Sequence, residues 1–178
     1  DMQLLSEVSI IALNDFGQPV ELPRGTLDTR IEASPVRVQA DSTLDLSGAG
    51  DIDFDLAIVD PMEEGRLEGV LNVQNVLLEP YRPMVVGLET LSGSLEGNIR
   101  IGGTVEQPDL QGRLALSGIN AAGPDVPLVI PDGEGNVAFN GESGTIDGAI
   151  SAERGRLDIS GNAVWPSNEP WRLGVDLN

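Results

Sequence analysis

Residues 91–118 read LSGSLEGNIRIGGTVEQPDLQGRLALSG, and this stretch decides the fold. Aliphatic residues recur there at even spacings on both sides of Gly102-Gly103, namely Leu95, Ile99 and Ile101, then Leu110, Leu114 and Leu116. An extended strand places residues two apart on the same face. The sequence therefore predicts two strands joined by a glycine turn, each with one aliphatic and one polar face.

The same alternation recurs along most of the chain, in Ile52, Phe54, Leu56 and Ile58, in Leu67, Leu71 and Val73, in Ile146 and Ile150, and in Leu157 and Ile159. The 22 Gly and 12 Pro among 178 residues disfavour long helices and favour short strands joined by turns, one of them predicted at Pro131-Asp132-Gly133. The length suits one domain, or one segment of a longer repetitive structure. We expect an all-β fold over residues 1–178.

Residues 75–87 break the alternation and contain Pro80 and Pro83. Proline removes a backbone donor and ends a regular ladder. The segment therefore predicts a short helical turn or loop on the apolar face, either as a lid or plug or as a plain connector.

Four glycines occupy positions on the apolar face, within the pattern apolar-x-Gly-x-apolar, at Gly69, Gly97, Gly112 and Gly148. Glycine inside a strand costs stability, so its repeated use there needs a reason. One interpretation is that these glycines let a strongly twisted sheet curve. The other is that they leave space inside a trough for something that is not protein.

The composition excludes most enzyme chemistry. The chain has no Cys, His or Lys, and its 10 basic residues are all Arg. It therefore lacks a Ser-His or Cys-His pair, an ordinary structural zinc site and a P-loop lysine. The formal charge of −19 repels nucleic acid, so we expect no nucleic-acid partner.

Carboxylates are the remaining candidate chemistry. Asp51, Asp53 and Asp55 alternate with Ile52 and Phe54, whereas an EF-hand loop needs Gly and Glu at the positions of Leu56 and Met62. A solvated acidic face, extended by Asp41 and Asp45, is the better interpretation, with weak cation binding as the alternative. Aromatic residues make up only 3% of the chain, too few for a typical sugar cleft. We expect no enzyme activity, cofactor or metal.

A family resemblance appears in residues 66–118. The Gly103-Thr104 turn followed by Pro108, Leu110 and Gly112 resembles the repeat of the AsmA-like family, and most closely its TamB branch, the DUF490-type domains. The resemblance implies a long, taco-shaped antiparallel or mixed sheet with an apolar groove. It also implies a place in the periplasm of a Gram-negative cell, movement of lipid to the outer membrane, and a barrel-assembly (TamA-like) partner. Alternation alone is equally compatible with a closed sandwich or barrel.

The leading hypothesis is a non-enzymatic segment that shields phospholipid acyl chains, or nascent outer-membrane strands, between the two membranes. The alternative is a scaffold that pairs by strand addition with the barrel-assembly partner. Because the chain begins with Asp1 and has no apolar run that could span a membrane, we expect an internal or carboxy-terminal portion of a longer protein, whose other parts contact membranes. The predicted groove wall comprises Leu67, Leu71, Leu95, Ile99, Ile101, Leu114, Leu116, Ile150, Leu157 and Ile159, with Gly69, Gly97, Gly112 and Gly148 providing space or curvature.

Overall fold

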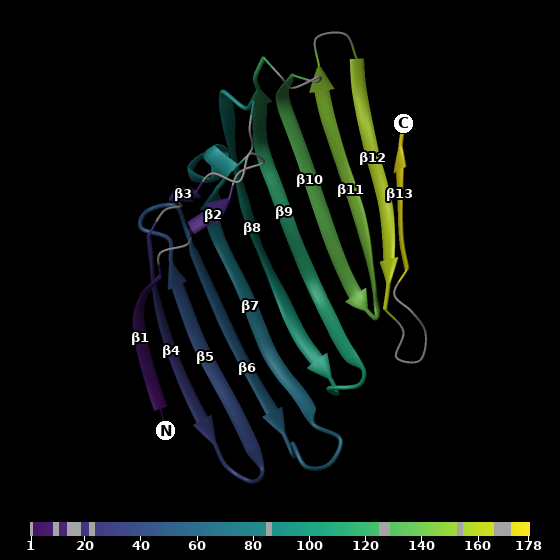
Figure 1. Cartoon of the computed structure of the whole chain (residues 1–178). Helices are drawn as coiled ribbons and strands as arrows, with labels where there is room; N and C mark the ends of the chain where they lie inside the picture. Colours follow the sequence, from purple (N-terminus) through teal and green to yellow (C-terminus); the bar gives the residue numbers. More distant parts are fainter. Residues whose placement is uncertain are drawn as a thin grey trace.

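The computed structural model describes residues 2–8, 11–13, 19–21, 24–84, 87–124, 129–152, 155–165 and 172–178. Most of these residues belong to one 11-stranded antiparallel sheet (Figure 1) with the order β1-β4-β5-β6-β7-β8-β9-β10-β11-β12-β13. A separate two-stranded ladder pairs β2 with β3.

The strands in chain order are β1 (Met2–Val8), β2 (Ile11–Leu13), β3 (Pro19–Glu21), β4 (Gly25–Ala33), β5 (Arg37–Asp45), β6 (Asp51–Val59), β7 (Arg66–Leu77), β8 (Thr90–Gly103), β9 (Pro108–Ala122), β10 (Ile130–Gly141), β11 (Ser143–Ala152), β12 (Gly155–Val164) and β13 (Arg172–Leu177). The 3-10 helix η1 (Glu79–Met84) joins β7 to β8.

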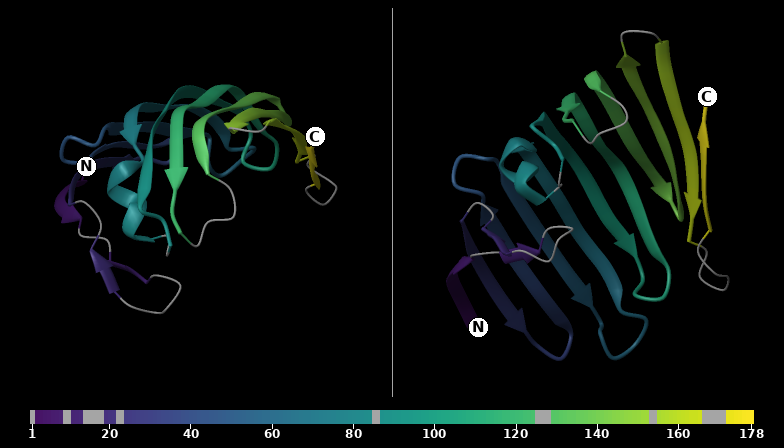
Figure 2. Two further views of the ribbon diagram at one scale, coloured as in Figure 1. Left: turned by 90° about the horizontal axis from the view of Figure 1, so that it is seen from above. Right: turned by 45° about the horizontal axis from the view of Figure 1, so that its top comes forward.

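From β4 onward each strand pairs with the next one along the chain. The sheet does not close, since β1 and β13 lie at its two ends. Seen from above, it arches (Figure 2), as expected for strands with a strong right-handed twist. The predicted all-β, curved and open antiparallel sheet is confirmed, and the closed sandwich or barrel is excluded.

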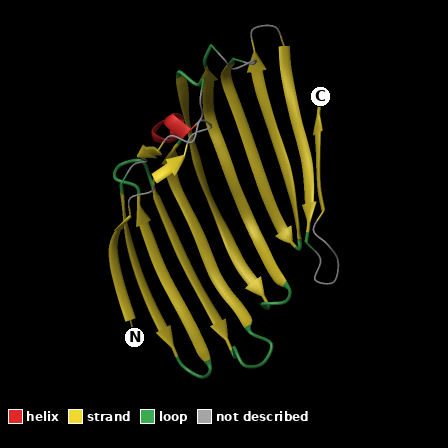
Figure 3. Cartoon of the chain, viewed as in Figure 1, coloured by secondary structure: helices red, strands yellow, loops and turns green. Residues whose placement is uncertain are grey.

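The segment predicted as a helical turn contains η1, which confirms that prediction. Figure 3 shows this helix in red at the end of the strands, and Figure 2 shows it under the arch. Tyr81 of η1 packs against a buried cluster formed by Leu46, Ala49, Val73 and Val76. The apolar face of β7 therefore lies on the concave side of the sheet.

The turn predicted at Pro131-Asp132-Gly133 is wrong, because these residues lie within β10. The ladder between β9 and β10 changes register between Ile130 and Gly133 and again between Gly133 and Gly135. Such irregularities let one strand carry extra residues without reversing. Pro, Asp and Gly occur both in turns and at irregularities within a strand. The residue types alone therefore could not distinguish a turn from a bulged strand here.

Little of the sheet is covered by a second layer. In the described part of the chain, the buried apolar residues are Leu46, Ala49, Ala57, Val73, Val76, Ile99, Ala121, Ala149 and Trp165. The accessible surface is 11283 Å², whereas a compact monomer of 18.8 kDa exposes about 8300 Å². The excess means that a sheet with an aliphatic face is left largely open.

Candidate functional site

The cross-strand register assigns every second residue to the same face. Leu71, for example, lies between Phe54 of β6 and Ile99 of β8. We call the face that carries these side chains and contacts η1 the inner face, and the opposite one the outer face. The central row of the inner face, from β1 to β13, is Leu4, Thr29, Ser42, Phe54, Leu71, Ile99, Gly112, Phe139, Gly144, Ala163 and Leu173.

All ten predicted wall residues lie on the inner face by this register. Ile99 is buried, with 6% of its surface exposed. The others are half-buried: Leu67, Leu71, Leu95, Ile101, Leu114, Leu116, Ile150, Leu157 and Ile159. Their side chains touch neighbours along the sheet but present one side to the concavity. The structure thus brings the predicted set together, while its role in binding stays a prediction.

The four predicted glycines also lie on the inner face, but they differ in the space around them. A Cβ on Gly69 would lie 2.6 Å from the carbonyl oxygen of Asp55. On Gly97 and Gly112 it would collide with the backbone of Arg113 and of Asn98 respectively. Only at Gly148 is the nearest atom, the Glu134 carbonyl oxygen, as far as 3.1 Å. Close approach of adjacent strands therefore explains three of the glycines, which favours the curvature interpretation.

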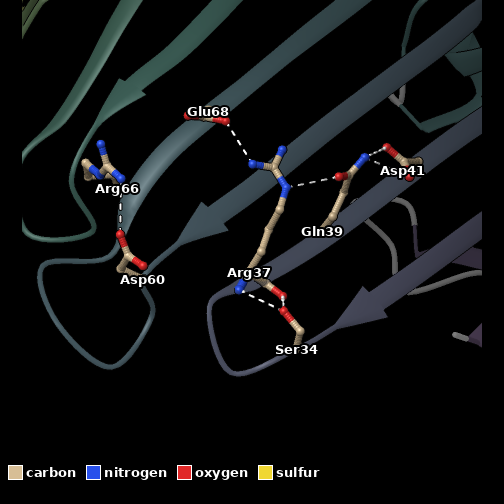
Figure 4. Close-up of polar contacts among 7 residues, drawn as sticks. All are labelled: Ser34, Arg37, Gln39, Asp41, Asp60, Arg66 and Glu68. Carbon is tan, nitrogen blue, oxygen red and sulfur yellow. Dashed lines mark hydrogen bonds and ion pairs between the residues drawn. The ribbon is translucent and has the colours of Figure 1, made fainter.

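The outer face carries a ladder of polar contacts across β5 and β7 (Figure 4). The Arg37 guanidinium donates to Glu68 Oε2 at 3.0 Å and to Gln39 Oε1 at 3.3 Å. Gln39 in turn donates to Asp41. A second ion pair joins Arg66 to Asp60 at 3.1 Å. These side chains are exposed, so each pair contributes at most about 1 kcal/mol to stability.

The predicted acidic face is the outer face of β5 and β6. Asp41 lies directly opposite Asp55, and Asp45 directly opposite Asp51. The pKa of Asp55 is raised by partial desolvation, by its hydrogen bond with Asp41, and by the charges of Asp41 and Asp53. Asp53 accepts hydrogen bonds from Thr43 and Gln74. Among the described residues, no group of three or more acidic side chains is arranged to hold a metal ion.

One inner-face feature was missed from the sequence. The hydroxyls of Thr29 and Ser42 lie 3.1 Å apart across β4 and β5. The sequence does show that each apolar alternation is interrupted by a polar residue. Thr29 lies between Leu27 and Ile31, and Ser42 lies between Ala40 and Leu44. Only the register shows that the two interruptions meet.

These features define a class of protein: an open, single-layer antiparallel sheet with an aliphatic concave face and a charged convex face. The family described as "TamB, N-terminal domain" matches residues 2–116, and the chain belongs to the TamB family. It is 25% identical over 150 residues to the translocation and assembly module subunit TamB of Haemophilus influenzae. That match covers 84% of this chain and 11% of the relative. No solved structure matches the chain.

No helix among the described residues is long and apolar enough to cross a lipid bilayer. The matched family region runs from β1 through most of β9. It therefore includes the Thr29–Ser42 hydroxyl pair and the central strands of the inner face. Where the chain lies within a longer protein stays a prediction.

Proposed function

We propose that the chain is a segment of an outer-membrane biogenesis protein, standing in the periplasm, whose inner face shields the acyl chains of phospholipids on their way to the outer membrane. The family supports a role in a translocation and assembly module, and therefore a non-enzymatic one. The observation that carries the proposal is the half-exposed and largely aliphatic inner face.

The dimensions suit an acyl chain. The 11 strands of the sheet span about 48 Å at about 4.8 Å per strand. Burial of each methylene contributes about 0.8 kcal/mol, so a tail of about sixteen carbons gains on the order of 10 kcal/mol. Aliphatic contacts have no preferred direction. A bound chain can therefore be held and still move along the sheet.

The acidic outer face complements this role. Exposed carboxylates keep a protein with a large apolar face soluble. Like charges also discourage two such sheets from packing outer face to outer face.

Photo-crosslinking at two adjacent positions of β8 tests the proposal. A crosslinking residue at Ile101 lies on the inner face, and one at Arg100 lies on the outer face. We expect phospholipid adducts from position 101 and few from position 100. Ile101→Arg should stop lipid delivery to the outer membrane while the protein still accumulates, with Arg100→Ala as the matched control. Equal adducts at both positions, or normal delivery in the Ile101→Arg variant, would contradict the proposal.

A second function is favoured by the open edge at β13. Leu173, Val175 and Leu177 are 68%, 52% and 63% exposed. Asp158 and Asn178 exchange both backbone hydrogen bonds, at 2.9 and 3.0 Å. Since hydrogen-bonded pairs alternate along an antiparallel ladder, the N–H of Val175 points away from β12. The edge can therefore accept a strand from a barrel-assembly partner or a neighbouring segment.

Proline at position 175 removes an edge-facing donor and leaves the bonds to β12 intact. We expect Val175→Pro to abolish pairing with the partner in a pull-down without lowering stability. Gly174→Pro is the control. The N–H at position 174 donates to β12, so the loss of this hydrogen bond should destabilise the β12–β13 ladder. Unchanged partner binding in the Val175→Pro variant would exclude pairing at this edge.

A further inference from the structure

Among the described residues, the inner face contains one pair of polar side chains in contact. Along the described strands of this face, the residues are aliphatic, aromatic or glycine except for Ser6, Thr29 and Ser42. Thr29 and Ser42 are direct partners in the central row, and their Oγ atoms lie 3.1 Å apart. Both residues are half-buried.

The residues around the two hydroxyls are apolar apart from Ser6, which lies opposite Leu27. Leu4 and Phe54 flank them along the row, and the neighbouring rows are Leu27–Leu44 and Ile31–Ala40. A hydrogen bond in such surroundings is stronger than in water. A lone hydroxyl covered by an acyl chain would lose its water partners at a cost. The two hydroxyls avoid this cost by bonding to each other.

The bond between the hydroxyls uses one of their two protons. The second O–H therefore remains a donor, and each oxygen keeps acceptor capacity. An ester carbonyl is an acceptor without a donor, so it complements this arrangement. In a glycerophospholipid such carbonyls lie where the acyl chains begin.

We infer that the Thr29–Ser42 pair is a binding point for the ester carbonyl of a diacyl glycerophospholipid, at one end of the aliphatic inner face. This inference rests on the proposed function. From the pair, the sheet extends over eight further strands, β6 to β13, or about 38 Å. A lipid whose carbonyl is bound to the pair can lay its acyl chain over this surface.

The inference predicts that the protein distinguishes an ester from an ether. The experiment uses palmitoyl-oleoyl phosphatidylethanolamine, labelled with carbon-13 at its carbonyls, and the matching diether lipid. Since one net hydrogen bond is at stake, we expect the full chain to bind the diester about two- to tenfold more tightly than the diether. The infrared carbonyl stretch of the bound diester should shift to lower frequency.

The double variant Thr29→Val with Ser42→Ala replaces both hydroxyls by apolar groups of similar shape, which is nearly neutral for stability. It should bind the two lipids equally and lose the infrared shift, while its affinity for the diether stays the same. Thr43→Val is the control, because Thr43 lies on the outer face and donates to Asp53. Circular dichroism checks that each variant folds.

The outcomes separate the two proposals. Equal binding of diester and diether by the wild-type chain, without a carbonyl shift, overturns the binding point but leaves acyl-chain shielding in place. Binding of neither lipid overturns both. Persistence of the ester preference in the double variant shows that the selective group lies elsewhere and also overturns the inference.

Discussion

Gly112 of β9 lies directly opposite Ile99 of β8, so close that a Cβ on the glycine would meet the Ile99 Cα at 2.9 Å. Its φ of 143° also lies in a region that other residues rarely adopt. The inner face thus keeps its curvature at this point because one residue of the pair has no side chain.

Gly112→Ala should therefore destabilise the sheet by about 1–3 kcal/mol, measured as a lower midpoint of urea unfolding. Gly135→Ala is the control. A Cβ at position 135 meets nothing nearer than 3.8 Å, and alanine there should be neutral or stabilising by up to about 1 kcal/mol. Equal losses in the two variants would contradict the close-approach explanation.

The pair Asp41 and Asp55 predicts a pH dependence. The pKa of Asp55 is raised above its ordinary 3.8, so in the pH range just above 3.8 the folded chain binds more protons at this site than the unfolded chain. This site's contribution to stability therefore falls as pH rises through that range, and the resulting loss is fully present at neutral pH. Asp55→Asn removes the repulsion between the two carboxylates and should therefore stabilise the fold at pH 7. The gain should be small, about 0.2–1 kcal/mol, because the site is exposed to solvent and its charges are screened.

The gain from Asp55→Asn should vanish on acidification below pH 3.8 and shrink in high salt, which denaturant unfolding at several pH values would show. Asp147→Asn is the matched change, since Asp147 lies opposite Asn136 and Ser160 rather than another carboxylate. A similar gain from Asp147→Asn would point to overall charge rather than to the pair.

Tyr81 should control whether η1 stays on the inner face. It is the η1 side chain that packs against the Leu46, Ala49, Val73 and Val76 cluster. Tyr81→Ala should cost about 1–2 kcal/mol, less than a fully buried aromatic would. It should also speed hydrogen exchange at the amides of Leu78 and Tyr81, whose bonds to Gly93 and Leu78 measure 2.9 and 3.0 Å.

Met84→Ala, at a residue that is 37% exposed, should leave the exchange of these amides unchanged. Exchange that accelerates equally in β11 and β12 after Tyr81→Ala would instead indicate global unfolding.

Trp165 offers a fluorescent report of cargo on the inner face. Its ring lies over Gly144, 3.6 Å from where a Cβ would be, and its centroid is 6.1 Å from that of Phe139. In a Trp171→Phe background, phospholipids with brominated acyl chains should quench Trp165 emission, whereas brominated soluble amino acids at equal concentration should not. Quenching that requires bromine on the headgroup would place the lipid outside the inner face.

The alternation of residues such as Leu95, Ile99 and Ile101 was sufficient to predict the strands and the composition of their two faces. It could not show whether the sheet closes, because inward and outward positions alternate identically in a barrel. Nor could it show that Thr29 meets Ser42, since that contact depends on the β4–β5 register. At Pro131-Asp132-Gly133 the same residue types serve a bulge instead of a turn. Where the backbone geometry is set by partners on other strands, local sequence is insufficient.

The chain-order pairing of β4 to β13 has a mechanical consequence. Each of these strands is bonded to its neighbours in sequence, so tension applied at the carboxyl end peels off β13 first and then β12, one ladder at a time. Under load the sheet would lose whole strands from this end, one after another. The inner face formed by the remaining strands would keep its shape.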